Sequence, residues 1–224
     1  MSYSRKVYVK AASTLERRRS KAERTQSMHR EEAYAKIPEL ISIDREISSA
    51  GAEVIRAIGM GENAQRFIEE LSKKNLAAQQ RRKDILKENG YPEDYLDADY
   101  TCKKCRDTGF VSGVMCDCYK ELLRDTALAE LNELSQSTRS TFESFNVNYY
   151  PDTSDPVTGV NPRSRMKEIL DFCKDYAADF GTDSPSLLLY GATGLGKTHL
   201  SLAIASEAIR KGYGVIYGSA QNLM

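Results

Sequence analysis

The sequence predicts an α+β protein in which a helical N-terminal region and a small four-cysteine knuckle precede the start of an α/β P-loop domain. Three observations support this prediction. Apolar residues recur every three or four positions before residue 90, four cysteines cluster near residue 110, and a glycine-rich loop lies between an apolar run and a helical pattern. The predicted regions are 1–100 (helical), 101–120 (knuckle), 121–162 (helical and aromatic linker) and 163–224 (the N-terminal part of the P-loop domain).

Composition excludes few function classes. The chain of 224 residues carries 32 basic and 32 acidic residues, so its net charge of zero indicates no particular partner. Residues 1–24 are nevertheless basic, with eight Lys/Arg against two Glu, and are expected either to contact nucleic acid or an acidic partner or to form a solvated tail or helix. The start of the chain lacks the apolar core of a secretory signal, and no apolar run approaches the ~18 residues of a membrane span. We therefore expect a cytoplasmic protein.

Two amphipathic helices are predicted between residues 38 and 88. Pro38 suits the first turn of the first helix, residues 59–63 break the pattern, and Gly90 followed by Pro92 ends the second helix. The apolar stripe of the first helix contains Leu40, Ile43, Ile47, Ala50, Val54 and Ile58, and that of the second contains Phe67, Ile68, Leu71, Ala78, Ile85 and Leu86. Stripes this narrow predict a helical hairpin or coiled coil. It serves either as a structural arm or as a docking surface for another protein, and we favour docking.

Four cysteines form two close pairs, Cys102 with Cys105 and Cys116 with Cys118. Each pair can hold one side of a tetrahedral Zn²⁺, and Gly109 and Gly113 lie between the pairs, where they can close a hairpin. We predict a structural zinc site, with a redox pair or unrelated thiols as the alternatives. Four protein ligands would leave no open coordination position, which argues against metal catalysis.

A linker follows the knuckle. Residues 121–140 predict a charged helix, and an aromatic connector contains Phe142, Phe145, Tyr149 and Tyr150. Residues 165–180 predict an amphipathic helix in which Cys173 is a buried apolar residue rather than a metal ligand or nucleophile.

The strongest motif is the phosphate-binding loop G-x-x-x-x-G-K-[ST], which residues 191–198 fit at every fixed position. Residues 186–190 before it predict a buried strand, residues 199–211 after it predict a helix, and residues 213–217 predict a second strand parallel to the first. Lys197 is expected to contact the β/γ-phosphates of a nucleotide and Thr198 to bind Mg²⁺. His199 is expected to pack locally or to face the nucleotide without a catalytic role. The predicted nucleotide-binding residues are Gly191, Ala192, Thr193, Gly194, Leu195, Gly196, Lys197 and Thr198.

Hydrolysis of ATP needs a later apolar strand that ends in an acidic residue, and only 26 residues follow Thr198. We therefore expect the front portion of a longer protein, in which ATP and Mg²⁺ bind. Whether this chain is an ATPase stays open, and no catalytic residue is assigned.

The order of these parts resembles the DnaC/DnaI-type bacterial replicative helicase loaders, particularly their zinc-containing members. The resemblance rests on residues 89–96 (NGYPEDYL), on Cys102-x-x-Cys105-x-Asp107-Thr108-Gly109-Phe110 with Cys116-x-Cys118, on residues 141–145 (TFESF) and on the loop at 191–198. It implies an AAA+ core with ATP, Mg²⁺ and Zn²⁺ as ligands. It also implies an N-terminal docking region for a hexameric replicative helicase, contact with single-stranded DNA, and an ATP-dependent homo-oligomer. The Walker B acid, sensor residues and arginine finger of that family have no counterpart here.

Three other interpretations stay open. A transposition-helper ATPase shares the AAA+ core but usually has a shorter N-terminal region, and the knuckle argues against it. A zinc and coiled-coil interaction protein could use the P-loop as a nucleotide switch. A small-molecule kinase seldom carries such a long helical region before its P-loop.

Overall fold

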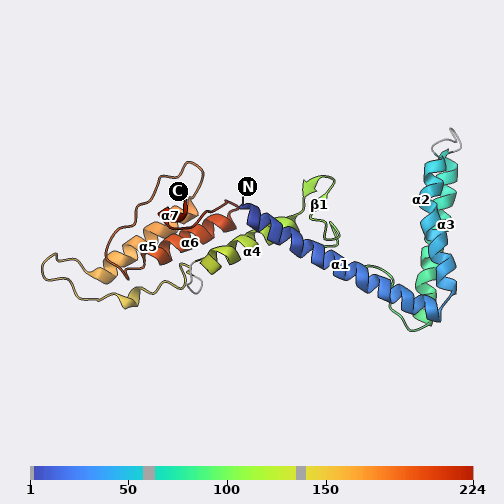
Figure 1. Ribbon diagram of the computed structural model, residues 1–224, viewed down its shortest axis with the longest axis horizontal. Coiled ribbons are helices and arrows are strands. Elements are labelled where there is room, and N and C mark those ends of the chain that lie inside the picture. The colour runs from blue at the N-terminus through green and yellow to red at the C-terminus, as the bar shows by residue number, and fades with distance from the viewer. Residues whose placement is uncertain (1–2, 58–63, 135–139, 224) are drawn as a thin grey trace. The chain divides into compact units, whose positions relative to one another are not determined.

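The computed structural model describes residues 3–57, 64–134 and 140–223, and its chain divides into two compact units. Unit 1 comprises Met1–Leu15 with Gly109–Met224, and unit 2 comprises Glu16–Thr108. Most of the secondary structure is helical (Figure 1). The elements are α1 (Arg5–Lys36), α2 (Glu39–Ala57), α3 (Ala64–Glu88), β1 (Phe110–Val111), β2 (Val114–Met115), α4 (Asp117–Leu134), η2 (Val147–Tyr149), α5 (Pro162–Ala178), α6 (Lys197–Arg210) and α7 (Ala220–Leu223).

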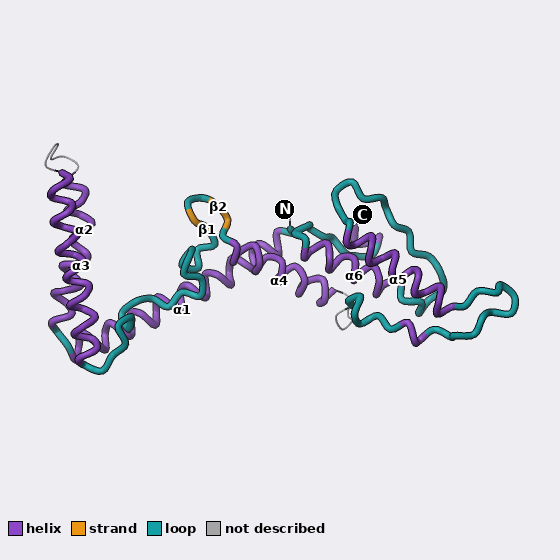
Figure 2. The backbone as a smooth tube through the Cα atoms, turned by 180° about the vertical axis from the view of Figure 1, so that it is seen from behind, coloured by secondary structure: helices purple, strands orange, loops and turns teal. Residues whose placement is uncertain are grey.

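Unit 2 contains the predicted helical hairpin. Helices α2 and α3 lie side by side in both Figure 1 and Figure 2, and they begin and end close to the predicted positions. Gly90 adopts φ 80°, and the Tyr91 N–H donates to the Leu86 carbonyl at 2.9 Å, so a left-handed residue ends α3 as expected. Ile58 and the predicted break at 59–63 lie outside the described residues.

The core of unit 2 occupies the half of this hairpin that contains the start of α2 and the end of α3, the lower half in Figure 1. It contains Ala33, Ile37, Leu40, Ile43, Ala78, Ile85, Leu86 and Leu96. Polar contacts tie α1 to the segment after α3, because Glu32 accepts hydrogen bonds from Tyr91 and Tyr95 and His29 stacks on Tyr95 with ring centroids 4.0 Å apart. The end of α1 and residues 91–96 therefore close the base of the hairpin.

Unit 1 shows that the basic start of the chain is no solvated tail. Residues 5–24 lie within α1, and Tyr3, Val7, Ala11 and Leu15 are buried against α4 and α6. Their spacing of four residues places them on one face of a helix. Helix α4 begins at Asp117, four residues earlier than predicted, so Cys118 lies in its first turn. Residues 135–139 of the helix predicted over 121–140 lie outside the described residues.

Helices α5 and α6 pack together in unit 1 and carry the predicted apolar faces. Asn161 caps α5 by accepting a hydrogen bond from the Ser164 N–H. The second core of the unit contains Phe142, Leu170, Cys173, Ala177, Leu200 and Ala203. Cys173 is fully buried there, and burial raises the pKa of its thiol, as expected for an apolar core residue.

The two strands predicted at 186–190 and 213–217 are wrong. Both segments lack regular secondary structure, and within the described part of the chain the single sheet is the two-stranded β1–β2 ladder. A strand needs a neighbouring strand about 4.8 Å away to receive its backbone hydrogen bonds, and neither segment has one there. Exposed and half-buried residues still alternate along both segments, and Leu188, Tyr190 and Ile216 are exposed at 84%, 88% and 82%. The prediction that residues 186–190 are buried is therefore also wrong, since Leu188 and Tyr190 are largely exposed.

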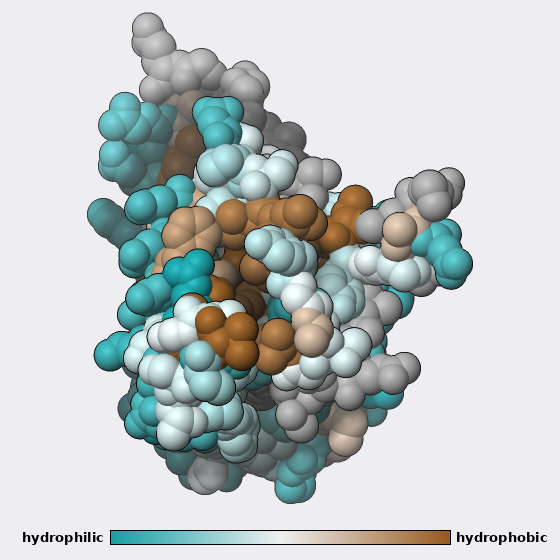
Figure 3. Space-filling model, turned by 90° about the vertical axis from the view of Figure 1, so that its left-hand side faces the viewer, coloured by the Kyte–Doolittle hydropathy of each residue, from teal (hydrophilic) through white to brown (hydrophobic). Residues whose placement is uncertain are grey.

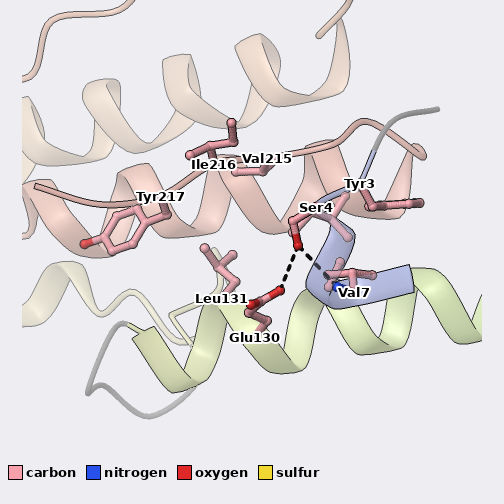
Figure 4. A pocket seen from close by; sticks show the side chains of 10 residues that line it. Tyr3, Ser4, Val7, Glu130, Leu131, Val215, Ile216 and Tyr217 are labelled. Carbon is pink, nitrogen blue, oxygen red and sulfur yellow. Dashed lines mark hydrogen bonds between the residues drawn. The ribbon is translucent and has the colours of Figure 1, made fainter. Parts of the chain in front are cut away.

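The segment 213–217 borders a hollow of about 180 Å³ in unit 1 (Figure 4). Ile216 and Tyr217 line it opposite Leu131 of α4. At its rim Ser4 donates to the Glu130 carboxylate at 3.3 Å. On the face of unit 1 seen in Figure 3, apolar atoms gather in the middle and hydrophilic atoms surround them. This unit therefore leaves apolar surface exposed.

Candidate functional site

The predicted phosphate-binding loop runs from residue 191 into the first turn of α6. Gly194 and Gly196 adopt φ 80° and 74°, a left-handed conformation that glycine tolerates and other residues rarely adopt. Gly196 is the N-cap residue of α6, so the loop leads directly to a helix N-terminus. The first N–H groups of a helix have no partner within the helix and attract anions. The loop therefore combines left-handed glycines with a helix N-terminus, two features on which the predicted phosphate binding depends.

Lys197 places its ammonium group inside this loop. The Nζ atom donates to the carbonyl oxygens of Gly191 at 3.0 Å and Ala192 at 2.6 Å, and the side chain is half-buried. An ammonium held among loop carbonyls can exchange these acceptors for phosphate oxygens without leaving the loop. Thr198 lies next to it and is exposed, so its predicted contact with Mg²⁺ stays a prediction.

The aromatic linker lies directly on the loop, which the sequence reasoning did not anticipate. A Cβ atom placed on Gly196 would fall 2.6 Å from Cε2 of Phe145 and 3.0 Å from the hydroxyl oxygen of Tyr150. The two rings stack on each other with centroids 6.1 Å apart. Two features therefore favour glycine at position 196: the positive φ of the backbone and the close approach of the linker side chains.

His199 attaches the linker to α6. Its Nε2 atom lies 2.8 Å from the Thr141 carbonyl oxygen and 3.2 Å from the Ser144 hydroxyl, and its ring meets Phe145 edge to face at 5.2 Å. His199 was expected to pack locally or to face the nucleotide, and the structure shows it packed against a segment more than fifty residues earlier in the chain. The aromatic connector was recognised in the sequence, but no pattern indicated which residues it would contact.

The four predicted zinc ligands come together. The sulfur atoms of Cys102, Cys105, Cys116 and Cys118 all lie within 4.8 Å of one another, close enough for all four to bind one metal ion. Cys105 and Cys116 are buried and the other two are half-buried. Soft thiolates in two close pairs are the donor set of a structural Zn²⁺, so the residues present fit the predicted ion. Zinc itself stays a prediction.

A buried carboxylate organises the first cysteine pair. Asp107 is 2% exposed and accepts hydrogen bonds from the Thr101 N–H at 2.8 Å and the Cys102 N–H at 2.9 Å, one at each oxygen. Asp107 and Arg106 also adopt positive φ values of 56° and 52°, which turn the chain sharply after Cys105. No sequence pattern indicated this role of Asp107, because its hydrogen-bond partners depend on the folded turn.

The hairpin between the two cysteine pairs forms as the glycines predicted. Phe110 pairs with Met115 and Val111 with Val114 in the antiparallel ladder of β1 and β2. The two turn residues between them, at 112 and 113, have φ values of 50° and 80°, the signs that a type I′ turn requires. At the base of the hairpin, the Cys116 N–H donates to the residue 109 carbonyl at 2.8 Å.

The comparison with protein families bears on the phosphate-binding loop. Residues 171–224 match the family described as IstB-like ATP binding protein. The IstB-like segment contains the whole loop and α6, which supports an ATP-binding, AAA+-type function for this part of the chain. Neither the curated proteins nor the solved structures gave a match.

The structure also bears on membrane association. Among the described residues, no helix combines the length and the apolar character that crossing a bilayer demands.

Proposed function

We propose that this protein is an ATP-binding helicase loader that helps to deliver a hexameric replicative helicase to single-stranded DNA. One observation carries the proposal, namely the order of parts along the chain. A helical hairpin with an incompletely covered apolar seam comes first, a four-thiol cluster follows, and an aromatic linker then lies on a phosphate-binding loop. This order joins a surface for a protein partner to a nucleotide site in one chain.

In this proposal the nucleotide is the regulatory ligand. Lys197 and the N-terminus of α6 would hold the phosphates, and Thr198 would hold Mg²⁺. The match to IstB-like ATP binding proteins over residues 171–224 supports this role for the loop. Phe145 and Tyr150 lie on Gly196, so a movement of the loop on nucleotide binding would displace these two side chains of the linker.

The zinc ion would be structural. Four thiolates saturate a tetrahedral ion and leave no position for water or substrate. Its role would be to fix residues 102–118, which contain only a two-residue pair of strands and no large apolar core of their own. Metal binding would then supply folding free energy that this short segment otherwise lacks.

A transposition-helper ATPase is the second candidate, because it shares the AAA+ core that the match to IstB-like ATP binding proteins supports. That match lies in the P-loop part, which both classes share. The two candidates differ in their partners, since a loader binds the replicative helicase and a transposition helper serves a transposase. A homo-oligomer that forms only with ATP is compatible with both.

A binding experiment tests the proposal. The full chain, loaded with zinc, is immobilised and exposed to the purified hexameric helicase of the same cell, with and without Mg-ATP. Saturable helicase binding supports the loader. Absence of helicase binding, together with binding of a transposase from the same genome, contradicts it and favours the second candidate.

The nucleotide part of the proposal has its own control. Lys197→Ala removes the ammonium and leaves the glycine backbone in place, so Mg-ATP should bind at least roughly tenfold more weakly, the loss of one charge-assisted contact. An unchanged ATP affinity would mean that the nucleotide binds elsewhere.

A further inference from the structure

Among the described residues, the half of the α2–α3 hairpin that lies toward the end of α2 and the start of α3, the upper half in Figure 1, is not fully covered. Ile47 and Val54 of α2 and Ile68, Leu71 and Leu76 of α3 line a hollow of about 440 Å³. Three of these apolar side chains are substantially exposed, Val54 at 39%, Ile68 at 38% and Leu76 at 61%. The seam is covered near the base of the hairpin, where the core of unit 2 lies, but not in this region.

The residues between the helices explain why the seam stays open. Ala50 and Gly51 stand on the α2 side, and a Cβ atom on Gly51 would meet nothing within 4 Å. Asn75 lies on the α3 side and donates its amide to the Ile47 carbonyl oxygen at 3.0 Å. Small residues and a polar side chain thus stand where large apolar residues would close the seam, which leaves room for the side chains of a partner.

A second hollow, of about 310 Å³, lies next to the first, since Ile47 lines both. Three arginines line it, Arg30 from α1, Arg45 from α2 and Arg82 from α3. We call the two hollows together the hairpin groove. It therefore has an apolar upper part and a basic lower part.

The charges of the lower part do not cancel. Arg82 pairs with Asp44 at 3.4 Å and with Asp97 at 2.8 Å, and Asp44 also accepts a hydrogen bond from Tyr34. Within the described residues, neither Arg30 nor Arg45 has a carboxylate at ion-pair distance. Three cations face two carboxylates that both already pair with Arg82, so the lower part attracts an anionic group.

We propose that the hairpin groove binds one amphipathic helix of a protein partner, with its apolar side chains in the upper part and an Asp or Glu carboxylate between Arg30 and Arg45. A helix fits the groove because α2 and α3 satisfy their own backbone groups, so no strand can pair with them, whereas two antiparallel helices offer ridges that a third helix can fit. An acidic residue on that helix would complement the charge of the two unpaired arginines.

This inference rests on the proposed function, because the helicase is the partner to be tested. It adds the chemistry of recognition: an acidic amphipathic helix rather than single-stranded DNA or a second copy of this chain. Single-stranded DNA would use the arginines but would leave Leu76 and Ile68 without a matching apolar surface.

The experiment measures the affinity of the full zinc-loaded chain for the purified helicase hexamer. The variant Arg30→Ala/Arg45→Ala should weaken binding by roughly tenfold or more and lower its dependence on salt, since two interfacial charges are removed. The variant Leu76→Ser should weaken binding without changing the salt dependence. Both groups of residues are exposed, so the helical content should stay unchanged by circular dichroism.

Two matched controls lie outside the groove. Arg66→Ala removes an exposed arginine of α3 that pairs with Glu70, and Lys73→Ala removes an exposed lysine of the same helix. Both should bind the helicase as the wild type does. A loss of affinity equal to that of the groove variants would show a general charge effect and overturn the proposal.

The possible failures are distinguishable. If the wild type does not bind the helicase, the proposed function and this inference fall together. If the wild type binds and the groove variants bind equally tightly, the groove inference alone is wrong and the loader proposal stands. The groove variants could instead leave helicase binding intact and abolish either a concentration-dependent dimer or the binding of single-stranded DNA. The groove would then bind a second copy of the chain or DNA, and not the proposed helix.

Discussion

The ring of Phe145 lies against Gly196, so close that a Cβ on the glycine would fall 2.6 Å from the ring. Forty residues or more of chain separate the aromatic linker from the loop, yet His199 holds them together through Thr141 and Ser144. The phosphate-binding loop is therefore packed against a second element on the side of its last glycine. This contact gives the loop a way to influence residues 141–150.

Alanine substitutions at two glycines of the loop should separate backbone strain from this contact. Gly194 and Gly196 both have positive φ, which costs a non-glycine residue about 1–2 kcal/mol, but a Cβ on Gly194 meets nothing within 4 Å. Gly196→Ala should therefore destabilise the protein more than Gly194→Ala in urea unfolding. Adding Phe145→Ala should recover part of the loss at Gly196 and none at Gly194. Equal effects of the two single changes would contradict the contact.

A tryptophan at Phe145 should report nucleotide binding, because the chain contains no tryptophan of its own. Phe145→Trp places the fluorophore on the loop, and Mg-ATP should change its emission as phosphates enter beside Gly196. Tyr149→Trp is the control, since that side chain is 85% exposed in the same linker and should not respond. The response of Phe145→Trp should vanish when Lys197→Ala is added. A response from both tryptophans would indicate a change in the whole linker instead.

The helices could be predicted from the sequence because each carries its own signals. Pro38 and Gly90 mark helix ends through local backbone chemistry, and α2, α3, α5 and α6 repeat apolar residues at helical spacing. The Asn161 cap was not recognised in the sequence, and α5 begins three residues before the predicted residue 165. The segments at 186–190 and 213–217, which were predicted as strands, carried an equally clear pattern. Their pairing depends on other strands, which local pattern does not reveal, and that is why the predicted parallel strands were wrong.

In both candidate sites, likewise, some residues could be predicted from the sequence and others could not. The loop glycines, Lys197 and the four cysteines were found because their chemistry fixes their spacing in sequence. Phe145, His199 and Asp107 were not assigned their contacts, because each acts on a residue whose position depends on the folded chain. Arg30 and Arg45 lie on different helices, so their proximity in the hairpin groove also needed the structure.

Asp107 should control how tightly the cysteine cluster holds zinc. Both carboxylate oxygens accept backbone N–H groups around Cys102, and an Asn side chain has only one oxygen to offer. Asp107→Asn should therefore weaken zinc binding by roughly 10- to 100-fold, the range for residues that orient metal ligands, measured by competition with a chromophoric chelator. Asp99→Asn, an exposed carboxylate paired with Lys103, should leave the affinity unchanged. A metal-free protein that is fully folded with four reactive thiols would contradict the zinc site itself.

Because of Glu32, the stability of unit 2 should depend on pH in the acidic range. Hydrogen bonds from Lys36 at 2.8 Å, Tyr95 at 2.8 Å and Tyr91 at 3.0 Å hold the pKa of this carboxyl at about 2, below its ordinary value of 4.5. Because the folded pKa is the lower one, ionised Glu32 stabilises the fold above about pH 4.5, and this contribution is lost as the pH falls toward about 2.

Glu32→Gln removes that contribution, so the comparison of wild type and variant isolates it from other effects of acid, which both proteins share. The difference between their urea midpoints should be largest near neutral pH and should shrink between about pH 5 and about pH 3. Glu31→Gln changes the neighbouring exposed carboxyl, which has no ion pair within the described residues, and should track the wild type at every pH. A difference between wild type and Glu32→Gln that stays constant across this range would show that the carboxylate charge does not stabilise the contact between α1 and residues 91–95.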